Sequence, residues 1–191
     1  MYVYPARMDL PPLTGARVVL RPFRVEDVPA VLAYASDAEV TRHLEWDAYD
    51  DPAMAAAFIR STHSGPPFWY AYAVTDRESG ALVGGADLRI LAAHDRRGEV
   101  GYGLARSYWG KGYAAEAAGL LVRFGFEQLR LERVQALCAV DNVRSLRTLE
   151  RVGMRREGRL FNYRAKHGRL GDHFLYAATS RTRILDAADA R

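Results

Sequence analysis

The stretch GEVGYGLARSYWGKGYAAEAAGLLVRFGFE, residues 98–127, decides the fold. In its first part Val100, Tyr102 and Leu104 alternate at period two, which predicts a β-strand with these side chains on one face. Its second part, residues 113–127, is rich in Ala, Leu and Glu and predicts an α-helix. The stretch is therefore a strand, a short turn and a helix in direct succession.

The turn between the predicted strand and the predicted helix contains Gly110 and Gly112. Because glycine has no side chain, backbone N–H groups stay uncovered at the helix N-terminus, where the helix dipole is positive. Lys111 adds a positive charge to the same turn. A Gly-x-Gly turn can also be purely structural, but in this position it predicts a site for a phosphate group.

Two other phosphate-binding loops are excluded. Residues 110–115 also fit G-x-G-x-x-A, the dinucleotide fingerprint, which requires a second strand ending in an acidic residue. Glu132 comes before the next expected strand, residues 134–140, and no further strand–helix alternation follows to complete a doubly wound sheet. A Walker A loop fails because no Gly-Lys-Ser/Thr follows a four-residue spacer. Neither a nicotinamide site nor a nucleoside triphosphatase is expected.

The segment Tyr108-Trp109-Gly110-Lys111-Gly112-Tyr113-Ala114-Ala115-Glu116-Ala117 resembles the acetyl-CoA pyrophosphate loop of the GNAT N-acetyltransferases. More narrowly, it resembles the RimJ/RimL-type N-terminal acetyltransferases of ribosomal proteins. The superfamily pattern Gln/Arg-x-x-Gly-x-Gly/Ala falls here on Trp109, Gly112 and Ala114, so its first position departs from the pattern. Tryptophan is usual there in the Rim-like branch, and the departure therefore narrows the resemblance.

The resemblance covers nearly the whole chain and implies a GNAT fold of the α+β class. Such a fold has a mostly antiparallel, twisted sheet of about seven strands, with a splay between the fourth and fifth strands and helices on both faces. The expected strands span residues 18–23, 68–75, 82–91, 98–104, 131–140, 154–160 and 172–179, and the expected helices 27–34, 37–44, 51–62, 113–127 and 142–151.

Composition indicates one domain over residues 1–191, with residues 1–13 as a surface arm and residues 181–191 as a frayed tail. No apolar run reaches the roughly 18–20 residues of a membrane span, and no signal peptide is recognisable, so a cytoplasmic protein is expected. Cys138 stands alone and the five histidines lack ligand spacing, so neither a disulfide framework nor a metal site is expected. The net charge of +4 favours an anionic ligand or a ribosomal neighbourhood, although an arginine-rich composition explains it equally well.

The resemblance also implies where acetyl-CoA, the co-substrate, binds. The pantetheine arm lies in the splay beside the backbone of the fourth strand, where one N–H polarises the thioester carbonyl, and the pyrophosphate accepts from the glycine turn. Asn142 hydrogen-bonds the pantetheine arm, although it could equally be an ordinary helix cap. Arg106, Lys111 and Arg144 offer charge near the adenine end. The cofactor residues are therefore expected to be Tyr102, Gly103, Leu104, Trp109, Gly110, Lys111, Gly112, Tyr113, Ala114, Ala115 and Asn142.

Two residues match catalytic positions of the family. Glu99 resembles the carboxylate that deprotonates the amine through a water molecule, although it could also be a solvated glutamate beside Arg96 and Arg97. Ser145 belongs to an Asn-x-x-Ser motif and is expected near the sulfur, as a proton donor or as the group that orients a water. Many relatives place a tyrosine acid one turn later, where this chain has Leu149, so a tyrosine acid at that site is excluded.

The acceptor amine is defined less well. Trp46, Tyr163 and Asp172 lie on segments that border the acceptor cleft in the family, and Asp172 could instead pair with Arg164 or Arg169. The leading hypothesis is an acyltransferase that acetylates the N-terminal α-amine of a protein, most simply a ribosomal one. The alternatives are acetylation of a small amine such as a polyamine, aminoglycoside or amino-acid derivative, and a non-catalytic CoA-binding protein of the ribosome. No membrane partner and no direct nucleic-acid motif are expected, and monomer and homodimer both stay open.

Overall fold

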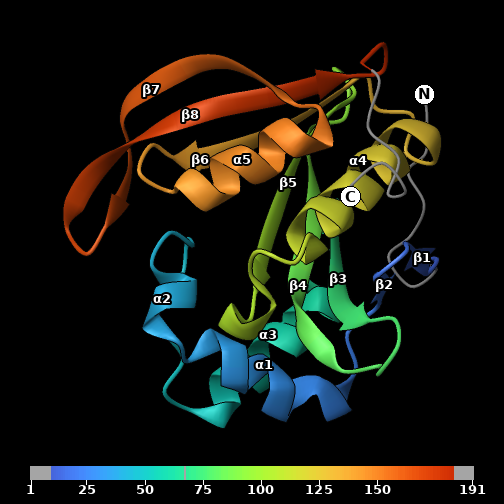
Figure 1. The fold of residues 1–191 in the computed structure, drawn as a ribbon, viewed down its shortest axis with the longest axis vertical. Coiled ribbons are helices and arrows are strands. Elements are labelled where there is room, and N and C mark those ends of the chain that lie inside the picture. The colour runs from blue at the N-terminus through green and yellow to red at the C-terminus, as the bar shows by residue number, and fades with distance from the viewer. Residues whose placement is uncertain (1–9, 67, 183–191) are drawn as a thin grey trace.

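The structure, a computed structural model, describes residues 10–66 and 68–182. Residues 1–9 of the expected arm and 183–191 of the expected tail lie outside these ranges. The described strands form one eight-stranded sheet in the order β1-β2-β3-β4-β5-β6-β8-β7 (Figure 1). They are β1 (Leu13–Thr14), β2 (Val18–Arg21), β3 (Trp69–Asp76), β4 (Leu82–Ala92), β5 (Arg97–Leu104), β6 (Arg133–Ala139), β7 (Arg155–Lys166) and β8 (Arg169–Thr179).

The described helices are α1 (Val28–Ala35), α2 (Ala38–Thr41), α3 (Pro52–Ser64), α4 (Tyr113–Glu127) and α5 (Val143–Val152). Figure 1 shows α4 and α5 side by side at the level of the upper sheet, while α1, α2 and α3 gather at its lower end. The predicted bounds of α4 are those observed. Within the described ranges, no helix combines the length and apolarity needed to cross a membrane.

The GNAT-like architecture predicted for the chain is confirmed, with two differences in the strands. Leu13 and Thr14 pair with β2 as a short edge strand, so the sheet has eight strands and the arm ends earlier than expected. The β7–β8 hairpin continues to residues 166 and 169, well beyond the predicted ends. Its register shifts between Leu160 and Arg164, and Asn162 has a positive φ of 49°. This bulge interrupts the period-two alternation, which is why the strand looked finished at residue 160.

Each face of the central sheet buries a different set of side chains. Tyr70 and Tyr72 of β3 pack edge-on against Phe124 of α4, with ring centroids 5.7 and 6.0 Å apart. On the opposite face Ala73 of β3 lies in a second core with α1 and α3. Val100 and Leu104 of β5 belong to the α4 core, as their alternation predicted. The helices therefore cover both faces.

The predicted splay lies between β5 and β6, the parallel pair of the sheet. Their pairing is confined to Arg97↔Arg133, Gly98↔Val134 and Glu99↔Gln135. Beyond Glu99 the two strands separate, so the last part of β5 has no β6 neighbour. The backbone at this point must find other partners or remain open.

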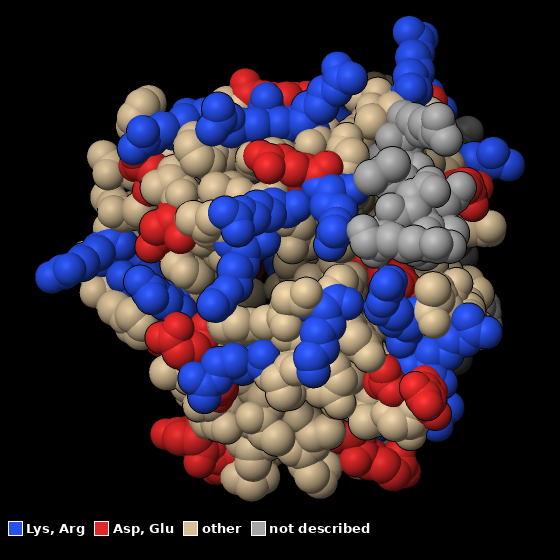
Figure 2. All heavy atoms as spheres, viewed as in Figure 1, with Lys and Arg blue, Asp and Glu red and all other residues tan. Residues whose placement is uncertain are grey.

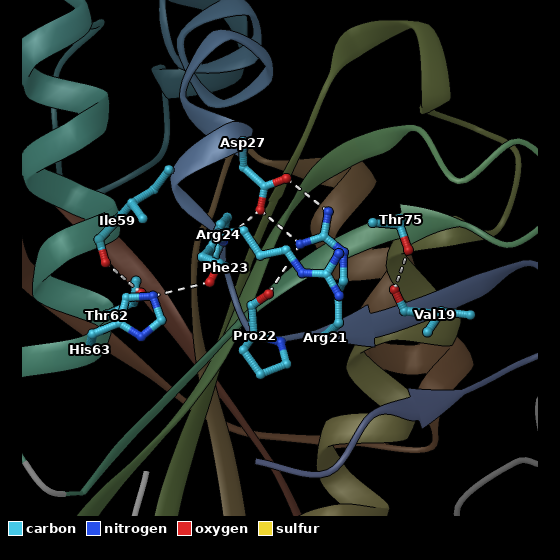
Figure 3. A network of polar contacts seen from close by, with 10 residues as sticks. All are labelled: Val19, Arg21, Pro22, Phe23, Arg24, Asp27, Ile59, Thr62, His63 and Thr75. Carbon is cyan, nitrogen blue, oxygen red and sulfur yellow. Dashed lines mark hydrogen bonds and ion pairs between the residues drawn. The ribbon is translucent and has the colours of Figure 1, made fainter. Parts of the chain in front are cut away.

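The entry to α1 differs from the predicted helix start at Asp27. A 3₁₀ turn, Val25–Asp27, precedes α1, and the Asp27 carboxylate makes no capping hydrogen bond to α1. It accepts instead from Nη1 and Nη2 of Arg21 at 2.7 and 2.8 Å and from the Arg24 N–H (Figure 3). Burial alone would raise the pKa of Asp27, but these donors outweigh it and lower the pKa. The pair fastens α1 to β2 and so fixes one wall of the site described below.

Candidate active site

The glycine turn before α4 presents bare amides. Gly110 and Gly112 have φ of +75° and +85°, a left-handed conformation that strongly favours glycine. Across the described ranges, the backbone N–H groups of residues 110–115 find no hydrogen-bond acceptor in the chain. Uncovered amides at the positive end of a fifteen-residue helix fit a diphosphate.

This turn forms one wall of a long cavity of about 900 Å³, which we call the outer groove. Its other walls come from the ends of β5 and α2 and from one side of α5. Four arginines line it: Arg42, Arg144, Arg147 and Arg151. Among the described residues, none of the four forms an ion pair with a carboxylate. Figure 2 shows Lys and Arg side chains crowding the centre of the face on which Figure 1 shows α4 and α5. The outer groove therefore suits an extended, anionic molecule.

The expected basic residues divide into those at the groove and those elsewhere. Arg144 lines the groove, and its guanidinium carbon lies 4.9 Å from the Trp109 ring centroid. Arg106 instead pairs with Asp37 at 3.1 Å, and the Lys111 ammonium lies 5.5 Å from the Tyr108 ring centroid. Trp109 donates its indole N–H to the Leu104 carbonyl at 2.8 Å, which ties the turn to the end of β5. The Trp109 side chain therefore stabilises the position of the turn relative to β5.

The open edge of β5 carries backbone groups in a regular alternation. Ala105 donates its N–H to the Val83 carbonyl of the β4 side at 2.8 Å, so the odd-numbered residues of β5 pair with β4. The even-numbered residues therefore turn their N–H and C=O groups toward β6, and beyond Glu99 no strand meets them. This brings Tyr102 and Leu104 to the gap, as expected, whereas the backbone of Gly103 points toward β4.

A second cavity, of about 290 Å³, lies on the α1–α3 side of the sheet and reaches through the gap; we call it the inner cavity. Besides Tyr102, six aromatic residues line it: Phe23, Tyr34, Trp46, Tyr49, Phe58 and Trp69. The outer groove and the inner cavity share His43, Leu44, Tyr102, Gly103, Asn142 and Ser145. These six residues form the junction, where a molecule in the groove meets one in the inner cavity.

At the junction the Tyr102 hydroxyl lies 2.8 Å from the Ser145 hydroxyl. Burial raises the pKa of the Tyr102 phenol, which therefore stays protonated. Asn142 caps α5, with its side-chain oxygen accepting from the Ser145 N–H at 3.3 Å. Cys138 is buried nearby, and burial raises the pKa of its thiol to about 11. Tyr102 was expected to contribute only backbone groups. The period-two pattern puts its side chain on the same face as Val100 and Leu104. That pattern was the one sequence signal that could have predicted where the phenol points.

Glu99 lies in the wall of the inner cavity, at the last β5–β6 pair before the gap. One of its carboxylate oxygens accepts from the Gln135 amide at 3.0 Å. The neighbouring Arg96 pairs with Glu132 at 2.9 Å, and within the described ranges no ion pair involves Glu99. Glu99 is half-buried in this wall and forms an ion pair with neither Arg96 nor Arg97.

A polar rim borders the inner cavity. Asp87 accepts from the Trp69 indole at 2.8 Å and from Arg89 Nε at 2.9 Å. Glu45 bridges Arg89 at 3.2 Å and Arg164 at 2.9 Å. Burial raises the pKa of Asp87 despite the opposing charge of Arg89. No signal in the sequence indicated that these residues lie together, because they come from the loop after α2 and from three strands.

Two histidines, His43 and His173, line the inner cavity. His43 Nδ1 lies 3.6 Å from an Asp141 carboxylate oxygen, and His173 is 7 % exposed on β8. Burial lowers the pKa of both imidazoles, so they are neutral near pH 7. In the part of the chain that the structure describes, no three His, Cys, Asp or Glu side chains are grouped to hold a metal ion.

The three expected acceptor residues lie in different surroundings. Trp46 lines the inner cavity, with its ring centroid 5.0 Å from that of Tyr49. Tyr163 is outside the lining, 48 % exposed, with its ring 5.8 Å from His173. Asp172 also lies outside it and accepts from the Asn162 N–H and from Arg159, not from the arginines considered for it. These donors, the backbone N–H first, lower the pKa of Asp172.

Comparison with known proteins agrees with this geometry. Residues 17–155 match the family described as "Acetyltransferase (GNAT) domain". "Uncharacterized N-acetyltransferase p20" of Bacillus licheniformis is 29 % identical over 167 residues, covering 86 % of this chain and 94 % of p20. "Putative ribosomal N-acetyltransferase YdaF" of Bacillus subtilis (strain 168) is 38 % identical over 80 residues, or 42 % of this chain and 44 % of YdaF.

A GNAT-family acetyltransferase structure from Bacillus anthracis superposes with a TM-score of 0.82 at 26 % identity. The match covers 89 % of this chain and 99 % of that structure. The family match extends over most of the chain, from β2 to the start of β7. GNAT acetyltransferases use acetyl-CoA, and the bare amides and basic groove described above suit its diphosphate. The chain belongs to the GNAT acetyltransferase family.

Proposed function

We propose that this protein transfers an acetyl group from acetyl-CoA to the N-terminal α-amine of a protein, in a ternary complex of the RimJ/RimL type. The observation that carries the proposal is the junction, where a groove with bare amides meets an aromatic cavity. A thioester whose diphosphate lies on residues 110–115 would extend along the open edge of β5 toward the junction. An amine in the inner cavity would approach the junction from the other face of the sheet.

Acetyl-CoA supplies the acetyl group, activated as a thioester. The residues proposed to hold it act mainly through the backbone: Tyr102 and Leu104 at the gap, and Gly110, Lys111, Gly112, Tyr113, Ala114 and Ala115 at the turn. Trp109 and Gly103 shape the walls, and Asn142 fixes the first turn of α5. The Tyr102 and Leu104 N–H groups face the gap and are suited to polarise a carbonyl there.

Glu99 is proposed to accept the proton that the attacking amine must lose. It lines the inner cavity where the gap begins, and one of its oxygens is held by Gln135. The other oxygen is available for a hydrogen bond to the amine or to one bridging water. The neutral imidazoles of His43 and His173 add no positive charge that would repel an approaching ammonium ion.

Ser145 is proposed to deliver a proton to the departing sulfur, and the serine oxygen then takes a proton back from water in the outer groove. Alone, a serine hydroxyl is a poor acid, but here it lies 2.8 Å from the protonated Tyr102 phenol. If Tyr102 donates to the serine oxygen, the serine proton is directed away from the tyrosine and toward the junction. Tyr102 is thereby a positioning residue for Ser145.

The α-amine of a protein is favoured as acceptor by the similarity to YdaF. Acetylation of a small amine is the second candidate, favoured by the bridges over the inner cavity. Lys166 of the β7–β8 hairpin binds the Trp46 carbonyl at 2.7 Å and Asp47 at 2.6 Å, and Arg164 binds Glu45. These bridges join the hairpin to the loop after α2 and narrow the entrance. A small molecule would pass between the bridged segments more readily than a protein chain.

The test is release of the CoA thiol from acetyl-CoA, measured over peptides with a free N-terminus and over a panel of small amines. Each peptide has a matched control whose α-amine is already acetylated. Thiol release with a free peptide and none with its acetylated control supports the proposal. Release with small amines alone supports the second candidate, and no release with any amine contradicts both.

A further inference from the structure

We infer that the inner cavity selects an amine whose neighbouring carbon carries an aromatic or bulky aliphatic group. This inference rests on the proposed acetyl transfer and adds the class of acceptor. It predicts that alanine- and serine-starting chains are poor substrates.

The first argument is the character of the walls. Phe23 and Phe58 meet edge-on with ring centroids 5.1 Å apart, and Phe58 meets Trp69 at 6.3 Å. Trp46 and Tyr49 form a second pair at 5.0 Å. Phe23 is buried in the core formed with α1 and α3, and Trp69 is held by the hydrogen bond from its indole N–H to Asp87. The rings are thus fixed in place and present apolar surface, with edges and faces that suit another aromatic ring.

The second argument is that the charges at the rim already have partners. Asp87 is bonded to Arg89 and Trp69, and Glu45 to Arg89 and Arg164. Among the cavity's described carboxylates, Glu99 is the one without an ion pair, and it is reserved for the reacting amine. No charge is left over for a second ammonium group, as in a polyamine, or for an acceptor carboxylate. The acceptor body is therefore uncharged.

The third argument is size. The inner cavity holds about 290 Å³, roughly twice the ~150 Å³ of an engineered apolar cavity that binds benzene. Part of this space is the junction, which the acetyl end would occupy. The remainder fits a ring or a branched side chain, whereas the methyl group of alanine would leave it largely unfilled. Burial of a side chain of phenylalanine size is expected to raise kcat/KM about 10- to 100-fold over alanine.

The inferred chemistry has two possible sources: the first residue of a protein chain, or a free arylalkylamine. The experiment compares thiol release from acetyl-CoA with two peptides that differ only in starting with Phe or Ala. Phenethylamine and spermidine complete the panel. Preference for the Phe peptide or for phenethylamine supports the inference, and the faster of the two identifies the source.

A cavity-filling variant tests whether the inner cavity itself makes the selection. Ala71 of β3 lines the cavity opposite Asp87 in the strand register, and Ala71→Leu would fill part of it. The Phe-to-Ala ratio of kcat/KM should fall at least fivefold. Ala57→Leu, on the exposed side of α3, is the matched control and should keep the wild-type ratio. Trp46→Ala, which removes one wall, should also lower the ratio if Ala71→Leu fails to fold.

The outcomes separate the inference from the function it rests on. No thiol release with any amine contradicts the proposed function. Thiol release with equal rates for the two peptides, a preference for spermidine, or an unchanged ratio in both folded variants overturns the inference while the acetyl transfer stands.

Discussion

The outer groove and the inner cavity are built in opposite ways. The groove's binding groups are consecutive backbone amides of one turn, residues 110–115, and two glycines give that turn its shape. The inner cavity is built from residues of α1, α3, α5, the loop after α2 and six strands. Recognition of a diphosphate is therefore local in sequence, whereas recognition of the acceptor depends on packing between distant segments. The junction, where Tyr102 meets Ser145, belongs to both.

The largest expected effect is a loss of kcat without a loss of acetyl-CoA affinity, caused by a substitution in the inner cavity. Glu99→Gln should lower kcat about 100-fold, since a positioned base contributes 10²–10⁴ to proton transfer, and should alter the acidic limb of the rate profile. Affinity for acetyl-CoA should stay at the wild-type value because Glu99 lies outside the outer groove. Steady-state kinetics and calorimetric titration measure the two quantities. The exposed Glu127→Gln serves as control, and unchanged kcat in Glu99→Gln would remove Glu99 from the mechanism.

The reverse pattern is expected in the outer groove. Gly112→Val forces a β-branched residue into φ of +85°, at a cost of about 2 kcal/mol. If this strain distorts the bare amides of residues 110–115, the Kd for acetyl-CoA should rise about 30-fold, with kcat at saturation nearly unchanged. Gly119→Ala, in the same helix and with open space around it, should bind normally. Equal affinity in Gly112→Val and Gly119→Ala would mean that the turn does not hold the ligand.

A smaller effect is expected at the junction. Tyr102→Phe removes the hydroxyl that holds Ser145 and should lower kcat about 5- to 10-fold, with both KM values unchanged. Ser145→Ala should lower kcat at least as much. Because the two act as a unit, the double variant should be no slower than Ser145→Ala alone. Additive losses would show that the hydroxyls act independently.

The smallest expected effect is a loss of folding stability at acid pH. It arises from a titrating side chain of the inner cavity, whereas the backbone amides of the outer groove do not titrate. Burial lowers the pKa of His173 below its unfolded value of about 6.5. Above pH 6.5 the imidazole is neutral in both states, and its contribution to stability is fully present. As the pH falls from about 6.5 through the folded pKa, the unfolded chain binds a proton that the folded chain does not, and stability is lost.

The pH dependence can be measured by thermal unfolding between pH 7.5 and 5. The midpoint of the wild-type protein should fall with acid, and His173→Gln should show a shallower decline over the same window. His167→Gln, on the exposed hairpin tip, is the control and should behave as wild type. A decline in His173→Gln as steep as in the wild-type protein would contradict a buried, neutral His173.

The sequence predicted features that depend on one short stretch and missed features that depend on packing between distant segments. The strand with Val100 and Leu104, the turn and the helix over residues 113–127 were predicted because their signals lie within one short stretch. The bulge near Asn162 was not, since it breaks the period on which strand prediction depends. Asp27 kept its place before α1, but its carboxylate turned to Arg21, a partner that only the tertiary structure supplies.

Among the site residues, those that match a family motif were predicted, and those that depend on packing were not. The roles of Glu99 and Ser145 came from a family pattern, and the structure places both at cavity walls. The Tyr102 phenol, the neutral His173 and the Glu45 bridge were not expected. Each depends on which elements meet across the sheet, and neither periodicity nor motif spacing carries that information.

The central claim is that the bare amides before α4 hold the diphosphate of acetyl-CoA. The most direct measurement is a titration of the ¹⁵N-labelled protein with CoA, followed by amide proton–nitrogen spectra. The largest shifts are predicted for Gly110, Lys111 and Gly112, followed by Tyr102 and Leu104 at the gap. If CoA binds while these five amides keep their positions and others move, the ligand lies elsewhere and the account is contradicted.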